Sequence, residues 1–234
     1  MNAPLHRIGV FGGTFNPIHN CHLIIARQAR QRLKLDLILF IPTGDPPHKA
    51  QESLAPARHR LEMVRLAVAS DPGFSCSELE ARRVGKSYSI DTIHLLRAEY
   101  PKAELFFIIG LDAFLEVEGW KQAEELIKHT HFVVVSRPGM RFSDLSRIPL
   151  LPSTDPTLLA TFDNGPIDRL DIALTSGTVL ILFRLPPCPI SASEIRLRLR
   201  NGESVANWLP DSVESYILCH ELYREDADRS GSKS

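Results

Sequence analysis

The chain has 234 residues, of which 44% are hydrophobic and 24% are charged, and its formal net charge is −1. These values are typical of a globular chain, and the near-zero charge excludes a global attraction to nucleic acid or to an anionic membrane. No apolar run reaches 18 residues and no signal-peptide pattern precedes the first predicted strand, so we expect no membrane contact and a cytoplasmic location.

Four cysteines are spread widely along the chain, at positions 21, 76, 188 and 219. None belongs to a C-x-x-C pair, which argues against a zinc knuckle and against a disulfide framework. We therefore expect free thiols in a reducing compartment.

Apolar runs alternate with amphipathic stretches along most of the chain. Residues 8–11 predict a buried strand, 19–33 a helix and 37–41 a second strand, which together form a βαβ unit with parallel strands. Further predicted helices cover 56–70, 90–100, 121–128, a stretch from 190 and 210–222, and further strands cover 74–77, 105–109, 131–135 and 179–183. This order predicts an α/β fold of the Rossmann-like, doubly wound type, with a mainly parallel sheet and helices on both faces.

Some stretches give weaker patterns. Residues 143–180 carry several prolines and no sustained period, so we expect an irregular insertion with one short helix and not a second domain. The charged stretch 78–86 is expected to be exposed, and 226–234 to be a flexible tail. In the first helix, the residues expected to point inward are Leu23, Ile24, Ala26 and Leu33.

Two histidines follow a Gly-rich turn near the start of the chain. The first predicted strand ends at Gly12-Gly13-Thr14, and His19 and His22 stand one turn apart on one helix face. Backbone N–H groups at such a turn and helix start bind phosphate well. A purely structural turn and a two-histidine metal site are the alternatives, although zinc needs further ligands and no H-E-x-x-H accompanies this pair. Phosphate chemistry is the leading hypothesis.

A second cluster stands at the start of the helix predicted from residue 190. Ser191 and Glu194 have capping-box spacing, and Ser193 and Arg196 follow in the first turns. An N-capped surface helix explains these residues, and so does a second phosphate site. Two helix N-termini at the carboxyl edge of one parallel sheet suit a polyphosphate between them. Neither a Walker A motif nor a G-x-G-x-x-G fingerprint is present.

These residues resemble the HxGH nucleotidyltransferases, which carry a Gly-x-Phe-x-Pro-x-His-x-Gly-His stretch and an Ile-Ser-Ser-Thr-x-x-Arg-like stretch. The matching stretches here are Gly13-Thr14-Phe15-Asn16-Pro17-Ile18-His19-Asn20-Cys21-His22 and Ile190-Ser191-Ala192-Ser193-Glu194-Ile195-Arg196. The middle of the chain resembles the bacterial nicotinate-nucleotide adenylyltransferase family. Its blocks are Ile41-Pro42-Thr43, Pro46-Pro47-His48-Lys49, Ser87-Tyr88-Ser89, Phe107-Ile108-Ile109-Gly110-Leu111-Asp112, Trp120 and Ser136-Arg137-Pro138-Gly139.

The resemblance implies a single nucleotidyltransferase domain over residues 1–225 that transfers AMP from ATP to nicotinate mononucleotide. The products would be deamido-NAD and pyrophosphate, in NAD biosynthesis, with Mg²⁺ bound mainly through the ATP phosphates. Two alternatives stay open: an adenylyltransferase for another acceptor, such as nicotinamide mononucleotide or phosphopantetheine, and a non-catalytic nucleotide-binding module. The oligomeric state also stays open, with a homo-oligomer among the options.

The resemblance also implies roles for individual residues. The implied catalytic residues are His19, His22 and Arg196. The implied ATP-binding residues are Gly12, Gly13, Thr14, Phe15, Gly110, Asp112, Arg137, Ile190, Ser191 and Ser193. The implied substrate-binding residues are Thr43, Lys49, Tyr88 and Trp120, and no protein side chain is implied as a metal ligand.

Three positions depart from the motifs of the superfamily. Cys21 stands where the motif has glycine, Asn16 where aspartate is usual, and Ala192 where a hydroxyl is usual. Because a thiol at a helix start tends to have a lowered pKa, we expect Cys21 to be a reactive free thiol that ATP protects from alkylation.

Overall fold

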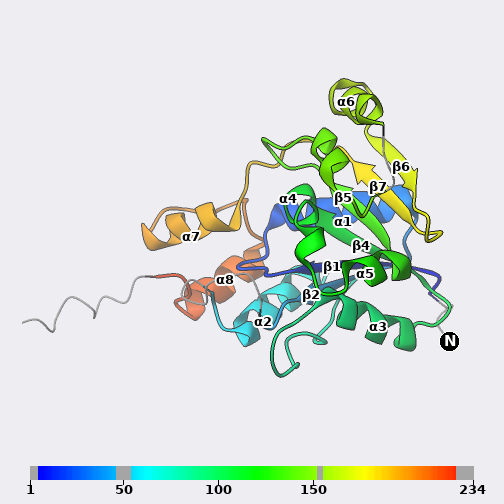
Figure 1. The fold of residues 1–234 in the computed structure, drawn as a ribbon. Helices are drawn as coiled ribbons and strands as arrows, with labels where there is room; N and C mark the ends of the chain where they lie inside the picture. Colours follow the sequence, from blue (N-terminus) through cyan, green and yellow to red (C-terminus); the bar gives the residue numbers. More distant parts are fainter. Residues whose placement is uncertain (1–4, 46–53, 152–154, 225–234) are drawn as a thin grey trace, which may run out of the picture.

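The computed structural model describes residues 5–45, 54–151 and 155–224 and contains one twisted sheet (Figure 1). In the described residues the sheet has seven strands in the order β3-β2-β1-β4-β5-β7-β6. All neighbouring pairs are parallel except β6 with β7. This confirms the predicted α/β fold with a mainly parallel sheet. The strands are β1 Arg7–Gly13, β2 Leu37–Pro42, β3 Phe74–Cys76, β4 Glu104–Gly110, β5 His131–Val135, β6 Arg169–Ala173 and β7 Val179–Phe183.

Helices cover both faces of the sheet because strand side chains alternate between two apolar cores. Ile38 and Phe40 pack on the face covered by α1, α2, α7 and α8. Leu39 and Ile41 pack on the opposite face, covered by α3, α4, α5 and α6. The helices are α1 Asn20–Leu33, α2 Ala57–Val68, α3 Ser89–Glu99, α4 Leu111–Phe114, α5 Ala123–His129, α6 Pro156–Asn164, α7 Ala192–Arg200 and α8 Asp211–Cys219, with 3₁₀ turns at Val117–Gly119 and Phe142–Arg147.

Two expectations about burial were wrong. Ile24 is 46% exposed, and Ile25 takes its place on the inner face of α1, because the helix phase places residues 25, 26 and 29 toward the sheet. The stretch 78–86 is not exposed throughout, since Glu80 is buried and accepts a hydrogen bond from Thr92 Oγ1 at 2.7 Å.

The stretch 143–180 is more ordered than we expected. It contains helix α6 and strand β6, which pairs with β7 as an antiparallel edge strand. Arg184 fixes the connection between them, because its guanidinium donates to the carbonyls of Phe162, Asp163, Gly165 and Ile167. The expectation of an irregular insertion is therefore corrected. The proposed tail 226–234 lies outside the described residues.

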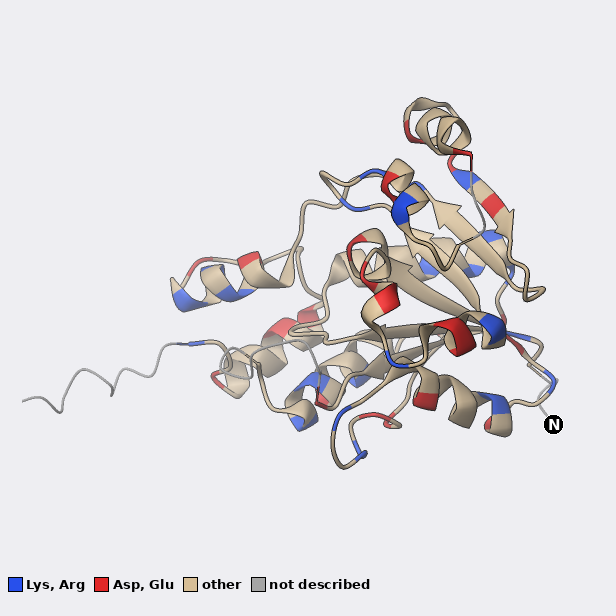
Figure 2. Ribbon diagram, in the orientation of Figure 1, with Lys and Arg blue, Asp and Glu red and all other residues tan. Residues whose placement is uncertain are grey.

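The ribbon coloured by residue type shows Lys and Arg positions as well as Asp and Glu positions on many of the helices (Figure 2). Helix α7 carries Arg196, Arg198 and Arg200, and it projects from the body of the molecule at the left of Figures 1 and 2. Within the described part of the chain, none of the helices combines the length and the apolarity that crossing a membrane requires.

Candidate active site

A cavity of about 750 Å³ opens at the carboxyl ends of the central strands. Strands β1 and β4 are neighbours, and the sheet order runs in opposite directions from them, so this is the topological switch point where doubly wound folds bind ligands. Residues from β1, β4, the following loops and α7 line the cavity. The predicted site residues that line it are Gly12, Gly13, Thr14, Phe15, His22, Thr43, Tyr88, Gly110, Asp112, Trp120, Arg137, Ser193 and Arg196.

Four predicted site residues are not on the described cavity wall. His19 is buried beside His22. Ile190 packs against the apolar core, and Ser191 Oγ caps α7 by accepting the Glu194 N–H at 3.1 Å, which confirms the predicted cap. Lys49 lies outside the described residues.

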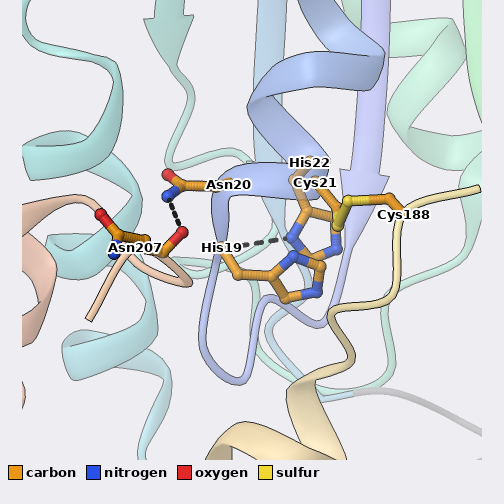
Figure 3. Close-up of a disulfide and its surroundings, with 6 residues drawn as sticks. All are labelled: His19, Asn20, Cys21, His22, Cys188 and Asn207. Atoms are coloured by element: carbon orange, nitrogen blue, oxygen red, sulfur yellow. Dashed lines mark hydrogen bonds between the residues drawn. A yellow bond between two sulfur atoms is a disulfide. The ribbon is translucent and has the colours of Figure 1, made fainter. Parts of the chain in front are cut away.

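The rings of His19 and His22 pack closely at the start of α1, at an interplanar angle of 30° (Figure 3). Their ring centroids are 3.7 Å apart, and the backbone N–H of His19 donates to Nδ1 of His22 at 3.2 Å. His22 also packs edge-on against Phe15, with ring centroids 5.1 Å apart. Because Nδ1 accepts this bond, the neutral His22 ring carries its proton on Nε2.

His19 sits in a dry environment. Its side chain is 4% exposed, and among the described residues its Nδ1 has no hydrogen-bond partner. Burial, together with the charge of Arg137, lowers the pKa of His19 to about 4. The His19 ring is therefore neutral at pH 7.

Arg196 joins the two sequence motifs directly. Its Nη1 donates to the backbone carbonyl of Asn16 at 2.8 Å, and its Nη2 lies 3.4 Å from Ser193 Oγ. The Asn16 side chain is itself fixed, because its Oδ1 accepts bonds from the Ala55 N–H and the Tyr223 hydroxyl. The guanidinium thus lies between the Gly-rich loop and the start of α7, where an anion would meet it.

A disulfide between Cys21 and Cys188 makes a second connection between these motifs (Figure 3). The two Cα atoms are 5.9 Å apart, a normal separation for such a bond. The expectation of free thiols throughout was therefore wrong, and Cys21 is not the reactive thiol that we predicted. Cys76 and Cys219 are the free cysteines of the described residues, and burial raises the pKa of Cys76 to about 11.

A buried arginine that sequence reasoning missed supports the floor of the cavity. Arg60 of α2 is 2% exposed. Its Nη1 donates to the carbonyls of Thr14 and Thr43 at 2.8 and 2.6 Å, and its Nη2 donates to Gly44 at 2.9 Å. One guanidinium therefore fixes the loop after β1 to the loop after β2. Because its partners are backbone carbonyls, no charge or hydroxyl pattern in the sequence indicates this role.

The other end of the cavity is aromatic. Trp120 packs edge-on against Phe107 with ring centroids 6.3 Å apart, and Lys121 Nζ lies 4.7 Å from the Tyr88 ring centroid. The Ser87 hydroxyl is buried on this wall and has no hydrogen-bond partner among the described residues. Sequence reasoning missed Lys121, whose charge next to Trp120 was the available signal.

Asp112 and Arg137 form an ion pair across the carboxyl ends of β4 and β5, with Nε and Oδ1 3.2 Å apart. Both side chains pack over Gly110, where a Cβ atom would collide with them. The pair places a carboxylate and a guanidinium on the wall of the cavity.

Comparison with known proteins agrees with this geometry. The cytidylyltransferase-like family model matches residues 10–198. The chain is 42% identical over 220 residues to a Pelobacter propionicus protein named "Probable nicotinate-nucleotide adenylyltransferase", covering 94% of this chain and 99% of that protein. A Geobacter metallireducens protein of the same name is 41% identical with the same coverage. The chain belongs to the nicotinate-nucleotide adenylyltransferase branch of the cytidylyltransferase-like family.

Solved structures of adenylyltransferases share the fold. The nicotinic acid mononucleotide adenylyltransferase of Plasmodium falciparum complexed with NaAD has a TM-score of 0.67 and 18% identity, and covers 93% of this chain and 97% of that one. The same enzyme complexed with APC has a TM-score of 0.66, 17% identity and the same coverage. At this identity the likeness concerns the fold alone.

The structure shows the surroundings of two positions, 21 and 192, at which this chain departs from the superfamily motifs. Cys21, in place of the motif glycine, is 2% exposed, and its sulfur bonds to Cys188. Ala192 lies on the cavity wall beside Ser193, which keeps a hydroxyl there.

Proposed function

We propose that this protein transfers AMP from ATP to nicotinate mononucleotide, giving deamido-NAD and pyrophosphate for NAD biosynthesis. The observation that carries the proposal is one cavity with two different ends, a cationic end at the two motifs and an aromatic end at Tyr88 and Trp120. The names of the relatives and the NaAD and APC complexes of the Plasmodium enzyme support the same reaction.

The ATP phosphates would lie between the Gly-rich loop and the start of α7. There His22 would donate from Nε2, and Arg196 would hold the outgoing phosphates together with Ser193. His19 would act through His22, since its backbone N–H orients the His22 ring. Arg137 and Asp112 would meet the adenosine side, where a guanidinium and a carboxylate suit a phosphate and a ribose hydroxyl.

The acceptor would occupy the aromatic end. A pyridinium ring can stack on Trp120 or Tyr88, which line this end together with Ser87. Thr43 would lie near the ribose phosphate, on the loop that Arg60 fixes. Lys49, the other residue that the resemblance implies for the acceptor, lies outside the described residues.

The chemistry requires no protein nucleophile. The acceptor phosphate attacks the α-phosphate of ATP in line, and pyrophosphate leaves toward Ser193 and Arg196. The protein contributes orientation of two bound phosphates and stabilisation of the charge that develops between them. A neutral Nε2–H donor and a fixed guanidinium provide both without proton transfer.

We also propose that Mg²⁺ accompanies ATP. Nitrogen donors and guanidinium groups dominate the phosphate end, and among the described residues no group of three His, Cys, Asp or Glu side chains could hold a metal ion. This donor set fits an ion held by phosphate oxygens and water, as Mg²⁺ prefers. The ion would supply further neutralisation of the phosphate charge.

The experiment is a pyrophosphate-release assay with ATP and one of three acceptors: nicotinate mononucleotide, nicotinamide mononucleotide or phosphopantetheine. The proposal predicts the highest kcat/KM with nicotinate mononucleotide. Higher efficiency with either other acceptor would reassign the substrate. ATP binding without release for any acceptor would indicate a binding module.

Two sequence predictions about the cellular state of the protein remain predictions. Cell fractionation tests the cytoplasmic location. Light scattering of the purified protein tests whether it forms a homo-oligomer.

A further inference from the structure

The disulfide joins the two phosphate motifs at positions that neither motif needs for its own fold. Cys21 is the second residue of α1 and lies between His19 and His22. Cys188 lies in the connection from β7 to α7, three residues before the Ser191 cap. Figure 3 shows the bond beside the two histidines. The covalent link lies behind the cavity wall, next to His22 in the chain on one side and close to the start of α7 on the other.

The connection that carries Cys188 is anchored near its ends, where the Leu185 N–H donates to Ser136 Oγ at 3.0 Å and Ile190 packs against the core. Residues 184–191 form neither helix nor strand, and residues 186, 187 and 189 are exposed. Beyond it, α7 is held by burial of Ile195 and Leu199 and by the Arg196 bond to the Asn16 carbonyl. The disulfide adds a covalent link between the entrance of α7 and the first turn of α1.

We propose that the Cys21–Cys188 disulfide is a positioning element for ATP, so that the redox state of this pair sets the affinity of the enzyme for ATP. The inference rests on the proposed function. With the bond formed, Ser193, Arg196 and His22 line one cavity before ATP arrives. With the bond reduced, residues 186–189 gain conformational freedom, and ATP binding must order them again.

A dithiol can reduce the disulfide by thiol–disulfide exchange. One thiolate of the dithiol attacks a sulfur of the disulfide and forms a mixed disulfide, and its second thiol then closes a cyclic disulfide. Two electrons pass to the protein, and Cys21 and Cys188 each take up a proton. Oxidation by a small disulfide reverses the exchange.

Thiol counting establishes the state of the pair. Under denaturing conditions without reductant, alkylation followed by mass spectrometry should modify two cysteines in the wild type, Cys76 and Cys219, and all four after dithiothreitol. Cys188→Ser should show three alkylated cysteines without reductant. Four alkylated cysteines in the unreduced wild type would overturn the proposal.

Titration calorimetry with α,β-methylene ATP and no acceptor then measures ATP affinity alone. Reduction of the wild type should weaken binding roughly tenfold, the equivalent of ordering about one residue's backbone. The Cys188→Ser variant should bind the ATP analogue as weakly as the reduced wild type does, and dithiothreitol should not change its affinity. Cys219→Ser, the matched control in α8, should respond to reduction as the wild type does.

Steady-state kinetics test whether the effect of reduction is confined to ATP. Reduction should raise the KM for ATP and leave the KM for nicotinate mononucleotide unchanged, because the bond lies at the phosphate end. Equal affinity of the oxidised and reduced forms, or tighter binding by the reduced form, would refute the proposal. Since calorimetry needs no turnover, this result is separate from failure of the proposed reaction, and circular dichroism of the reduced protein checks that the fold persists.

Discussion

The backbone N–H of His19 donates to Nδ1 of His22, so the first residue of the pair decides which nitrogen of the second carries the proton. The bond is local, spanning the start of α1, and the ring centroids are 3.7 Å apart. In the neutral His22 ring, the N–H donor is then Nε2. An Nε2–H donor suits the binding of a charged phosphate.

Removing the His22 donor should therefore impair turnover more than folding. We expect His22→Ala to lower kcat by about 10²–10³-fold, the usual effect of losing one donor to a developing charge. Steady-state pyrophosphate release measures kcat, and thermal unfolding should give a Tm close to that of the wild type. His94→Ala on the exposed face of α3 is the control. A kcat near normal in His22→Ala would refute the role.

His19 should make stability depend on pH. Its pKa is near 6.5 when unfolded and about 4 when folded, so the folded state binds the proton less well. The contribution is complete above pH 6.5 and is lost as pH falls toward 4, by about 2 kcal/mol at pH 5. Urea unfolding at pH 7 and pH 5 measures this difference. His19→Asn should remove that part of the pH dependence, and an unchanged slope would contradict the assignment.

Arg60 should not be replaceable by lysine. A single ammonium cannot reach the Thr14, Thr43 and Gly44 carbonyls in the geometry of the guanidinium fork. We expect Arg60→Lys to lower the free energy of unfolding by about 2–4 kcal/mol and to lower kcat more than it raises either KM, because both loops shift. Denaturant unfolding and steady-state kinetics test this. The control is Arg65→Lys on the exposed side of α2, which should change neither the free energy of unfolding nor kcat.

Trp120 should affect the acceptor and not ATP. We expect Trp120→Ala to raise the KM for nicotinate mononucleotide about tenfold or more, while Trp120→Phe retains most of the affinity because it keeps an aromatic face. The KM for ATP should stay within about twofold in both variants, since the phosphate end is unchanged. A larger change in the KM for ATP than in that for the acceptor would place Trp120 elsewhere.

Arg184 should control the order of the segment between α6 and β6. Its guanidinium donates to the carbonyls of four residues there, so Arg184→Ala leaves them without these partners. We expect faster amide exchange and faster proteolysis over 162–170, with the sheet core unaffected. Hydrogen-exchange mass spectrometry localises the change. Uniform exchange across the chain would indicate global destabilisation instead.

The sequence predicted the central elements well because their physical signals are strong. Strands β2, β4 and β5 are continuous apolar runs, and their register puts Gly13, Thr43 and Asp112 at one edge. Strand β6 was missed because it lies at the sheet edge, where its side chains are exposed or half-exposed and only Leu170 and Ile172 alternate.

Most of the features that sequence reasoning did not predict depend on contacts between residues far apart in the chain. Cys21 and Cys188 are 167 positions apart, and nothing local at either cysteine indicates the pairing. Glu80 stands among exposed charges in the sequence, yet folding places it next to Thr92 inside the protein, where burial raises the pKa of its carboxyl. Motif residues such as His22 and Arg196 were predictable, because the spacing of their own segments reveals them.

The Cys21–Cys188 bond also makes part of this chain a covalent ring. Strands β2 to β7 lie within the ring, whereas β1, which lies between β2 and β4, is outside it. A protease that cuts the exposed turn at Gly85 would therefore leave a nicked ring and not two separable fragments. A pulling force on the two ends would likewise pass through sulfur and leave the strands inside the ring unloaded.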